Sequence, residues 1–460
     1  MALLDPPNKQ RITGDPPKRL TFAEADRAIS ALSAHFIDAG LPANSVVAVQ
    51  LPNTVEFMLT VLAAHRAGLI VALLPLLWRQ AELTVALNRT GARAIVTSGR
   101  IEGVVHAGLA MNAAAEAFSI RHVCGFGNEL PEGMASLDLA FSGEFAATRA
   151  VTQDGRRAAI ISFDVTADGF RAVPRTHLNL IAGGLALSLE SDVPQGSTLM
   201  SAFAPSSFAG LTSSLVVWLL SGGTLSLQHP FDGDVFEQQI NEHTCDTLIA
   251  PAQLALRLAE IDMPSRLPGL RNVIGLWRAP EQVASSPFWT AEQAVLTDVY
   301  LFGEAGLFSV RRTADGAPAP ILPGPHGAPR EVPGSSIAGE ILLTSRGTLA
   351  LRGPMVAPAA YAPSAPARLS VGATAARLRR YRLCRPARSF DRRDLHYRAP
   401  LRGDGGRGLQ VPVAGSAAMG QAAGPGRAAD GIARPAERPP SCRARPGQRP
   451  CPRGACRARA

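Results

Sequence analysis

The chain contains only two lysines among its 460 residues, Lys9 and Lys18, both close to the N-terminus. Lysine binds phosphate in a Gly-Lys-Ser/Thr loop, moves protons in a Ser-x-x-Lys pair and forms imines in Schiff-base enzymes. No lysine follows position 18 in the sequence. These three chemistries are therefore excluded from the remainder of the chain.

Cysteine and histidine positions show no metal-binding spacing. Cys124 and Cys245 stand alone in the main body, four further cysteines fall in the last fifth, and no Cys-x-x-Cys occurs. The nine histidines are scattered, so no zinc site is predicted. The stretch Gly125–Leu130 begins like a dinucleotide-binding Gly-x-Gly-x-x-Gly motif but ends in leucine, and we interpret it as a turn. A Gly-x-Ser-x-Gly hydrolase motif is absent.

Neither a secretion signal nor a membrane span is predicted. The first residues, Met1–Arg11, include an acid and lack the apolar core of a signal peptide. The most apolar stretch, Met58–Trp78, is interrupted by His65, Arg66 and Gly68. It is typical of a helix followed by a buried strand. With its isolated cysteines, the body is expected to be a soluble cytoplasmic protein.

Apolar periodicity predicts the elements that would position a site. Thr21-Phe-Ala-Glu24 is a capping box that begins a helix, and Gly40 ends it. Alternating strands and helices follow, with strands predicted at 45–51, 69–74, 93–97, 158–163, 224–227 and 246–250, and helices at 54–66, 81–88, 178–189, 211–220, 235–243 and 253–261. Residues 314–336 are rich in proline and glycine and predict a loop or a β-turn region. Continuously apolar strands between helices predict a layered α/β fold with a largely parallel sheet.

The positive charge of the chain is confined to its last fifth. The whole sequence has 46 basic and 37 acidic residues, a net charge of +9. Residues 371–460 hold 20 arginines and five acids, a net of +15, so residues 1–370 carry 26 basic and 32 acidic residues, a net of −6. The basic character of the chain therefore says nothing about the partners of its body.

The composition changes at about residue 364, and we expect residues 364–460 to form a disordered tail. Only 13 of the 90 residues from 371 onward are large and apolar, too few to close a core. Arginine-rich blocks bind phosphate, so a nucleic-acid-binding arm is one interpretation. No aromatic-interleaved pattern is present on which bases could stack. We favour an unevolved extension, such as translation in a shifted frame produces.

Four segments of the body carry motif-like residues in a fixed order. They are Leu74-Pro75 with Ala81–Leu83 and Ala94–Ser98; Ile161–Leu180; Tyr300–Leu307; and Gly339–Leu342 with Arg352–Tyr361. Together they resemble the adenylate-forming enzymes, which include acyl- and aryl-CoA synthetases, luciferases and the adenylation domains of peptide synthetases. The resemblance covers residues 20–361, and it is the colinearity of the motifs that makes it specific. It implies the large N-terminal domain of such an enzyme at residues 20–363, after a leader at residues 1–19.

By this resemblance, Ile161–Leu180 occupies the place of the family's phosphate loop. The residues that match it, and that would bind ATP, are Thr166, Gly169, Arg171, Thr176 and His177, with Arg171 replacing the usual lysine. Val165 and Asp168 replace two glycines, and the acids Asp164 and Asp168 would repel polyphosphate. The alternative is a strand-to-helix turn that no longer binds ATP.

Further positions carry over to the adenine and metal sites. Glu304 matches the carboxylate that helps to hold Mg²⁺, Tyr300 matches the aromatic residue that stacks on adenine, and Ala279-Pro280 falls in the preceding turn of that pocket. The alternatives are a solvated acid at Glu304 and core packing at Tyr300. With Arg171, Glu304 would be the catalytic residue.

The resemblance implies AMP-forming activation of a small carboxylic acid by ATP and Mg²⁺, followed by transfer to coenzyme A. Neither the family's Thr-Gly-Asp motif nor its lysine-bearing C-terminal lid is recognisable in the sequence. We therefore expect impaired catalysis. Two alternatives stay open: a pseudoenzyme that binds an acyl or adenylate ligand, and a nucleic-acid binder acting through the tail.

Overall fold

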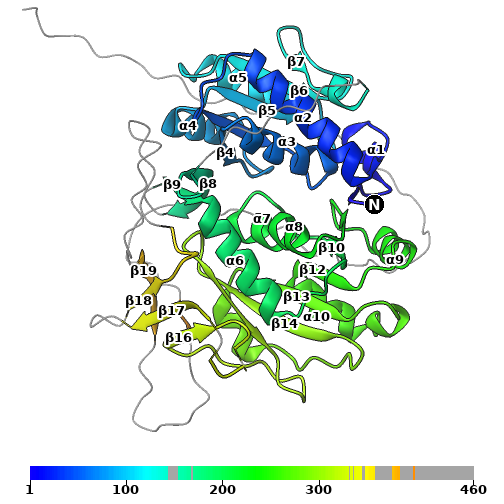
Figure 1. Ribbon diagram of the computed structural model, residues 1–460, viewed down its shortest axis with the longest axis vertical. Helices are drawn as coiled ribbons and strands as arrows, with labels where there is room; N and C mark the ends of the chain where they lie inside the picture. The colour runs from blue at the N-terminus through cyan, green and yellow to red at the C-terminus, as the bar shows by residue number, and fades with distance from the viewer. Residues whose placement is uncertain are drawn as a thin grey trace, which may run out of the picture. The chain divides into compact units, whose positions relative to one another are not determined.

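Two largely parallel sheets and one antiparallel sheet build the described part of the chain (Figure 1). The computed structural model describes residues 1–142, 154–166, 169–330, 332–334, 336–343, 348–357, 376–383 and 397–398, with the backbone alone for 166, 348, 376–383 and 397–398. The layered α/β architecture expected from the sequence is confirmed. Most of the predicted disordered tail lies outside the described residues.

The first sheet has seven strands in the order β7-β6-β5-β3-β4-β8-β9. Its strands are β3 (Val46–Gln50), β4 (Ile70–Leu73), β5 (Ala94–Ser98), β6 (His122–Phe126), β7 (Ala135–Ser136), β8 (Ala158–Thr166) and β9 (Gly169–Thr176). Its helices are α2 (Phe22–Asp38), α3 (Val55–Arg66), α4 (Gln80–Thr90), α5 (His106–Ala115) and the short 3₁₀ helix η1 (Asp138–Phe141). Alternate residues of β3 face opposite sides: Val47 and Val49 pack in the core that holds α3, and Val46 and Ala48 pack in the core that holds α4 and α5.

The second sheet has eight strands in the order β15-β14-β13-β12-β10-β11-β1-β2. They are β1 (Leu3–Leu4), β2 (Arg19–Leu20), β10 (Thr198–Ser201), β11 (Thr224–Leu227), β12 (Thr247–Pro251), β13 (Asn272–Trp277), β14 (Val295–Leu301) and β15 (Leu307–Arg311). The helices in this part of the chain are α1 (Lys9–Thr13), α6 (His177–Glu190), α7 (Phe208–Leu211), the π-helical turn η2 (Thr212–Val216), α8 (Val217–Ser221), α9 (Gly233–Glu242), α10 (Ala252–Glu260), η3 (Pro264–Arg266) and η4 (Pro280–Ser285). The six central strands run parallel, and β2 and β15 are antiparallel edges.

The third sheet is antiparallel and was not expected from the sequence. Its strands are β16 (Gly324–Gly327), β17 (Ile337–Leu343), β18 (Thr348–Arg352), β19 (Ala376–Leu383) and β20 (Tyr397–Arg398). Strand β16 lies inside the predicted loop at 314–336, and β19 and β20 lie inside the predicted tail. The apolar and polar residues of β19 alternate only in part, so the sequence carries no clear strand signal there.

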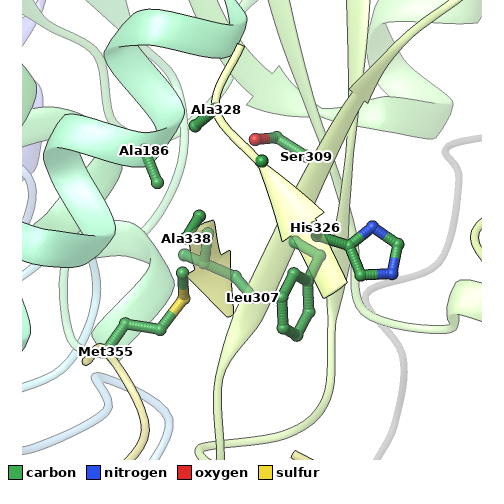
Figure 2. A pocket seen from close by; sticks show the side chains of 9 residues that line it. Ala186, Leu307, Ser309, His326, Ala328, Ala338 and Met355 are labelled. Carbon is green, nitrogen blue, oxygen red and sulfur yellow. The ribbon is translucent and has the colours of Figure 1, made fainter. Parts of the chain in front are cut away.

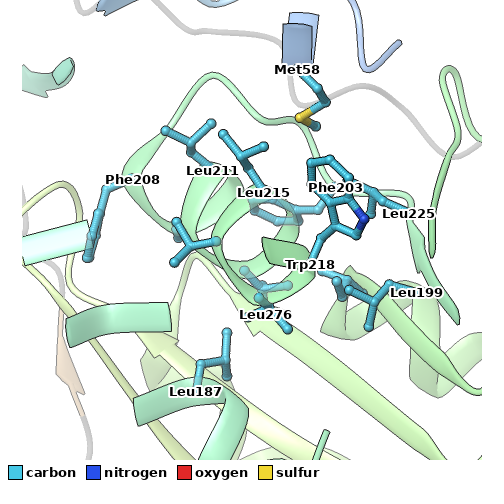
Figure 3. Close-up of a cluster of buried hydrophobic side chains, with 14 of the residues drawn as sticks. Met58, Leu187, Leu199, Phe203, Phe208, Leu211, Leu215, Trp218, Leu225 and Leu276 are labelled. Carbon is cyan, nitrogen blue, oxygen red and sulfur yellow. The ribbon is translucent and has the colours of Figure 1, made fainter. Parts of the chain in front are cut away.

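A continuous apolar core joins the first sheet to the second (Figure 3). Met58 of α3 points toward Leu211, Leu215 and Trp218 of the α7–α8 segment, and all four side chains are at most 3% exposed. The Trp218 indole also donates a 3.0 Å hydrogen bond to the Gly223 carbonyl. Within the described residues, no helix has the length and apolar character needed to cross a bilayer.

Residues 1–19, expected as a leader, are part of the folded domain. Strand β1 pairs with β11, and a buried group of charges fixes the segment that follows it. The Lys9 ammonium lies 2.6 Å from Asp5 and 2.5 Å from Glu56, and Lys18 lies 2.6 Å from Glu56. Asp5 also accepts the Val55 N–H at the start of α3, at 2.8 Å. We call Asp5, Lys9, Lys18 and Glu56 the N-terminal cluster.

The N-terminal cluster contains both lysines of the chain, and its charges shift the pKa values of Glu56 and Lys9. Burial alone would raise the pKa of Glu56, but the charges of Lys9 and Lys18 outweigh it and lower the pKa to about 2. Burial would lower the pKa of Lys9, but the charges of Glu56 and Asp5 raise it instead. The two lysines are therefore structural cations, held in place by the acids around them.

Candidate functional site

The segment expected to form the phosphate loop is a β-hairpin. Strand β8 ends at Thr166, β9 begins at Gly169, and the two residues pair across the antiparallel ladder. Gly169 has φ +98°, a left-handed conformation that favours glycine in a tight turn. Asp168 lies outside the described residues. The direct strand-to-helix connection in the alternative is wrong, because the whole of β9 lies between β8 and α6.

Arg171, the predicted phosphate ligand, pairs with Asp164 across the hairpin. Its Nη2 lies 3.3 Å from Asp164 Oδ2, and the two side chains are 52% and 22% exposed. An ion pair this exposed stabilises a fold by about 0–1 kcal/mol, so Arg171 can leave it at little cost. Asp164 nevertheless remains close to any anion that Arg171 would bind.

Arg175, four residues further along β9, is a buried cation that the resemblance did not indicate. Its guanidinium lies 3.6 Å from the centre of the Phe208 ring and donates from Nη2 to the Glu304 carbonyl. Its Nη1 lies 3.4 Å from Ser162 Oγ. Burial lowers the pKa of Arg175 to about 10, against the opposing charges of Glu304 and Asp164. Arg175 is therefore still charged at neutral pH.

Glu304 follows β14 and is held by groups from two other elements. Its Oε2 accepts a 3.0 Å hydrogen bond from the N–H of Phe208, the first residue of α7, and lies 3.9 Å from Arg175 Nη1. Ser207 caps the same short helix by accepting the Gly210 N–H at 3.0 Å. The Glu304 side chain is 12% exposed. Its charge is thus largely offset within the fold.

The hairpin and the turn after β14 also meet at Gly303. This residue has φ +56°, and a β-carbon there would lie 3.1 Å from Asp164 Oδ1. The structure therefore brings together Asp164, Arg171, Arg175 and Glu304, which we call the site cluster. With two cations and two carboxylates, it has no net charge.

One oxygen of the Glu304 carboxylate, Oε2, is already next to a donor and a cation. Mg²⁺ requires about six oxygen ligands at about 2.0–2.1 Å. The groups next to the Glu304 carboxylate are instead the Phe208 N–H and the Arg175 guanidinium, a donor and a cation. Among the residues that the structure describes, no group of three or more His, Cys, Asp or Glu side chains could hold a metal. A Mg²⁺ ion bound to Glu304 Oε2 would therefore compete with the Phe208 N–H and lie close to the positive charge of Arg175.

The predicted adenine pocket lies at the carboxyl ends of two neighbouring parallel strands. Tyr300 in β14 pairs with Trp277 in β13, and Ala279-Pro280 follows β13 directly. Open α/β sheets bind ligands at this edge. The Tyr300 ring is only 4% exposed, and its hydroxyl donates a 2.8 Å hydrogen bond to the Ala319 carbonyl. In this structure Tyr300 therefore serves as a core side chain.

Thr176 and His177 begin α6, and their contacts are those of a helix start. Thr176 Oγ1 accepts the Asn179 N–H at 3.1 Å, and the Thr176 N–H donates to Asn179 Oδ1 at 3.0 Å, a reciprocal capping box. The His177 ring packs edge-on against His65 at 4.8 Å. Burial lowers the pKa of both imidazoles, that of His65 to about 3, so both are neutral at pH 7. Binding of phosphate by either predicted residue would compete with these contacts.

A family model described as AMP-binding enzyme matches residues 3–337, well over half of the chain. The chain belongs to the AMP-binding enzyme family. The match includes all of the site cluster, as well as residues 3–19 of the segment expected to be a leader.

Individual relatives of this AMP-binding chain are distant. A medium-chain fatty-acid–CoA ligase of Escherichia coli is 23% identical over 285 residues, which cover 60% of this chain and 50% of the ligase. The chain thus spans about half the length of this curated relative. The crystal structure of an acyl-CoA synthetase from Brucella canis superposes with a TM-score of 0.62 at 20% identity, covering 83% of this chain and 70% of that one. A benzoate CoA ligase from Burkholderia xenovorans gives 0.59 at 16% identity, covering 81% and 72%. At these identities the solved structures support the fold alone.

A small pocket elsewhere in the AMP-binding chain has no charged lining. It lies between α6 and strands β15–β17, lined by Ala186, Leu307, Phe308, Ser309, His326, Gly327, Ala328, Ala338 and Met355 (Figure 2). The His326 Nε2 is 2.8 Å from the Leu322 carbonyl, so the imidazole is already engaged. This pocket offers packing rather than chemistry, and the site cluster remains the candidate site.

Proposed function

We propose that the chain is an acyl-CoA-ligase-like protein that binds an adenine nucleotide beside the site cluster and is severely impaired in activating a carboxylic acid. Family membership supports the nucleotide and acid classes. One observation supports the impairment: the Glu304 carboxylate is occupied by Arg175 and the Phe208 N–H. The name of the Escherichia coli relative makes medium-chain fatty acids the first substrates to test.

The reaction of such a ligase makes demands that the site cluster meets only in part. A carboxylate attacks the α-phosphate of ATP, pyrophosphate leaves, and the thiol of coenzyme A then takes the acyl group. Catalysis depends on positioning and on positive charge that neutralises the leaving polyphosphate. Here the positive charge of Arg171 is partly offset by Asp164, and that of Arg175 is partly offset by Glu304. Each lost preorganised charge costs about 10²–10³ in rate.

Exchange of pyrophosphate into ATP, measured with a panel of fatty and aryl acids, tests the catalytic half of this proposal. Thermal unfolding with AMP and ATP tests the binding half. We expect nucleotide-dependent stabilisation without exchange above the protein-free blank. Exchange with any acid would overturn the impairment, and the absence of a shift with both nucleotides would overturn the binding.

A further inference from the structure

The strongest unexplained feature of the site is a guanidinium that is buried completely. Arg175 is 0% exposed, and among large side chains it is one of the most deeply buried in the described residues. An ionised group is costly to bury unless its charge is offset and its N–H groups are bonded. Lys9 is buried as completely, but its ammonium lies 2.5–2.6 Å from two carboxylates, whereas Arg175 lies 3.9 Å from the Glu304 carboxylate. The charge of Arg175 is therefore the less completely offset of the two.

The partners of Arg175 come from two elements remote in sequence. Nη2 donates to the Glu304 carbonyl, Nη1 faces the Glu304 carboxylate at 3.9 Å, and the plane lies over the Phe208 ring. The same Glu304 oxygen accepts the Phe208 N–H. Arg175, Glu304 and Phe208 thus contact one another, with the cation beside the carboxylate.

One donor of this group is left over. Arg175 Nε is buried and has no hydrogen-bond partner among the described residues. The other two nitrogens are used as above, with Ser162 Oγ 3.4 Å from Nη1. A buried guanidinium N–H without an acceptor is suited to an anionic oxygen brought by a ligand.

We propose that Arg175 takes the place of a divalent cation beside Glu304, so that this chain binds the phosphate of an adenine nucleotide without a metal. The inference rests on the proposed function only for the identity of the ligand. Its structural half, the displacement of a metal by Arg175, concerns the protein alone. The two halves are tested separately.

The metal half uses the unliganded protein and three variants. Arg175→Gln removes the internal cation, Arg175→Gln combined with Glu304→Gln removes both partners, and Arg171→Gln removes the half-exposed arginine of the same strand. Thermal unfolding is measured with and without millimolar Mg²⁺ or Mn²⁺ at constant ionic strength. We expect Arg175→Gln to unfold at a lower temperature and to recover in part with either metal. The unfolding temperatures of wild type, Arg171→Gln and the double variant should not change when either metal is added.

A folded Arg175→Gln that shows no metal-specific recovery would overturn the inference. If that variant does not fold, Mn²⁺ titration of the wild type, followed by water-proton relaxation, decides instead. We expect no stoichiometric Mn²⁺ site. A stoichiometric site that disappears in Glu304→Gln would show that Arg175 does not displace the metal, and would overturn the inference.

The ligand half uses AMP, which binds Mg²⁺ weakly in solution, as the probe. Its affinity for the wild type is measured by calorimetry in EDTA and in Mg²⁺. We expect dissociation constants within about threefold of each other, a difference of about 0.7 kcal/mol. Tightening by tenfold or more in Mg²⁺ would overturn the inference and leave the proposed function standing. No AMP binding in either condition would overturn the proposed function, and the metal half would then decide the inference alone.

Discussion

The N-terminal cluster and the site cluster have the same inventory, two cations and two carboxylates, but differ in how tightly the charges meet. In the N-terminal cluster both lysines lie 2.5–2.6 Å from their acids. In the site cluster the two ion pairs span 3.3 and 3.9 Å, and one of the arginines is half-exposed. The charged groups of the N-terminal cluster are therefore in direct contact, whereas those of the site cluster are further apart.

The difference separates structural charge from charge available to a ligand. Each lysine of the N-terminal cluster is bonded to an acid, and the buried charged-group atom left there without a described partner is an acceptor, Glu56 Oε2. In the site cluster the atom left over is a donor, Arg175 Nε, and Arg171 can leave Asp164 at little cost. A buried cationic donor without an acceptor suits an anionic ligand, whereas a buried carboxylate oxygen does not.

The largest effect is expected for Lys9→Met. This substitution leaves the buried acids Asp5 and Glu56 facing each other without their main cation. Removing one partner of a buried pair destabilises a protein by about 3–5 kcal/mol. Urea unfolding measures the change, with Lys18→Met as the control, because the Lys18 side chain is 21% exposed and pairs only with Glu56, while its backbone N–H keeps its bond to Asp5. Equal losses of stability in both variants would contradict a cluster in which Lys9 is the main cation for the two buried acids.

Acid should weaken the N-terminal cluster within a defined window. The pKa of Glu56 is lowered from 4.5 to about 2 in the folded state, so the unfolded chain binds the extra proton first. The contribution of ionised Glu56 to stability is therefore complete above pH 4.5 and is lost as the pH falls toward about 2. Burial raises the pKa of Asp5 from 3.8 to about 6, which favours the folded state as the pH falls to 3.8, so unfolding measured from pH 3.8 toward about 2 should show the loss from Glu56. Lys18→Met should narrow this pH window, because the charge of Lys18 helps to lower the pKa of Glu56. An unchanged dependence of stability on pH would contradict this electrostatic coupling between Lys18 and Glu56.

A smaller effect is expected for Glu304→Gln, which keeps the shape of the side chain and removes its charge. Arg175 retains the Glu304 carbonyl and stays near Asp164, so the loss should be about 1–3 kcal/mol, less than for Lys9→Met. Thermal and urea unfolding measure it. A stabilised Glu304→Gln would mean that the carboxylate is a burden on the fold and not the partner of Arg175.

Arg171→Gln should change stability least, by no more than about 0.5 kcal/mol, because its ion pair with Asp164 is exposed. The affinity of the Arg171→Gln variant for AMP should nevertheless fall if Arg171 binds phosphate. Calorimetry and unfolding on the same protein separate the two effects. A loss of stability as large as that of Glu304→Gln would contradict the distinction between the exposed pair Arg171–Asp164 and the buried pair Arg175–Glu304.

Part of the alternation of helices and strands in the first two sheets was predicted from the sequence because those signals are local, whereas α5, β6, β10, β13, β14 and β15 were not predicted. The helix from Phe22 to Asp38 follows from its capping box, and β3 from five consecutive apolar or buried positions. The two-residue strand β1 carries no such signal, because it is defined by its partner strand. Strand β9 was not predicted, because Ile161–Leu180 was interpreted through its resemblance to a phosphate loop.

The site was predictable in outline and not in detail. Motif order placed Arg171 and Glu304 in one site, and the fold brings their segments together. Arg175 carries no local signal, since its burial is set by Glu304 and Phe208, 129 and 33 residues away. The rarity of lysine was visible in the sequence, but only the fold joins Lys9 and Lys18 to one buried acid.

The central claim is that Glu304 is neutralised from within the chain and no longer supports adenylation. Pyrophosphate exchange with Mg²⁺-ATP and a medium-chain fatty acid, run on wild type and on Glu304→Gln, tests it most directly. The account predicts no exchange above the protein-free blank for either protein. Exchange by the wild type that is lost in Glu304→Gln would contradict it, because it would show Glu304 at work in the reaction.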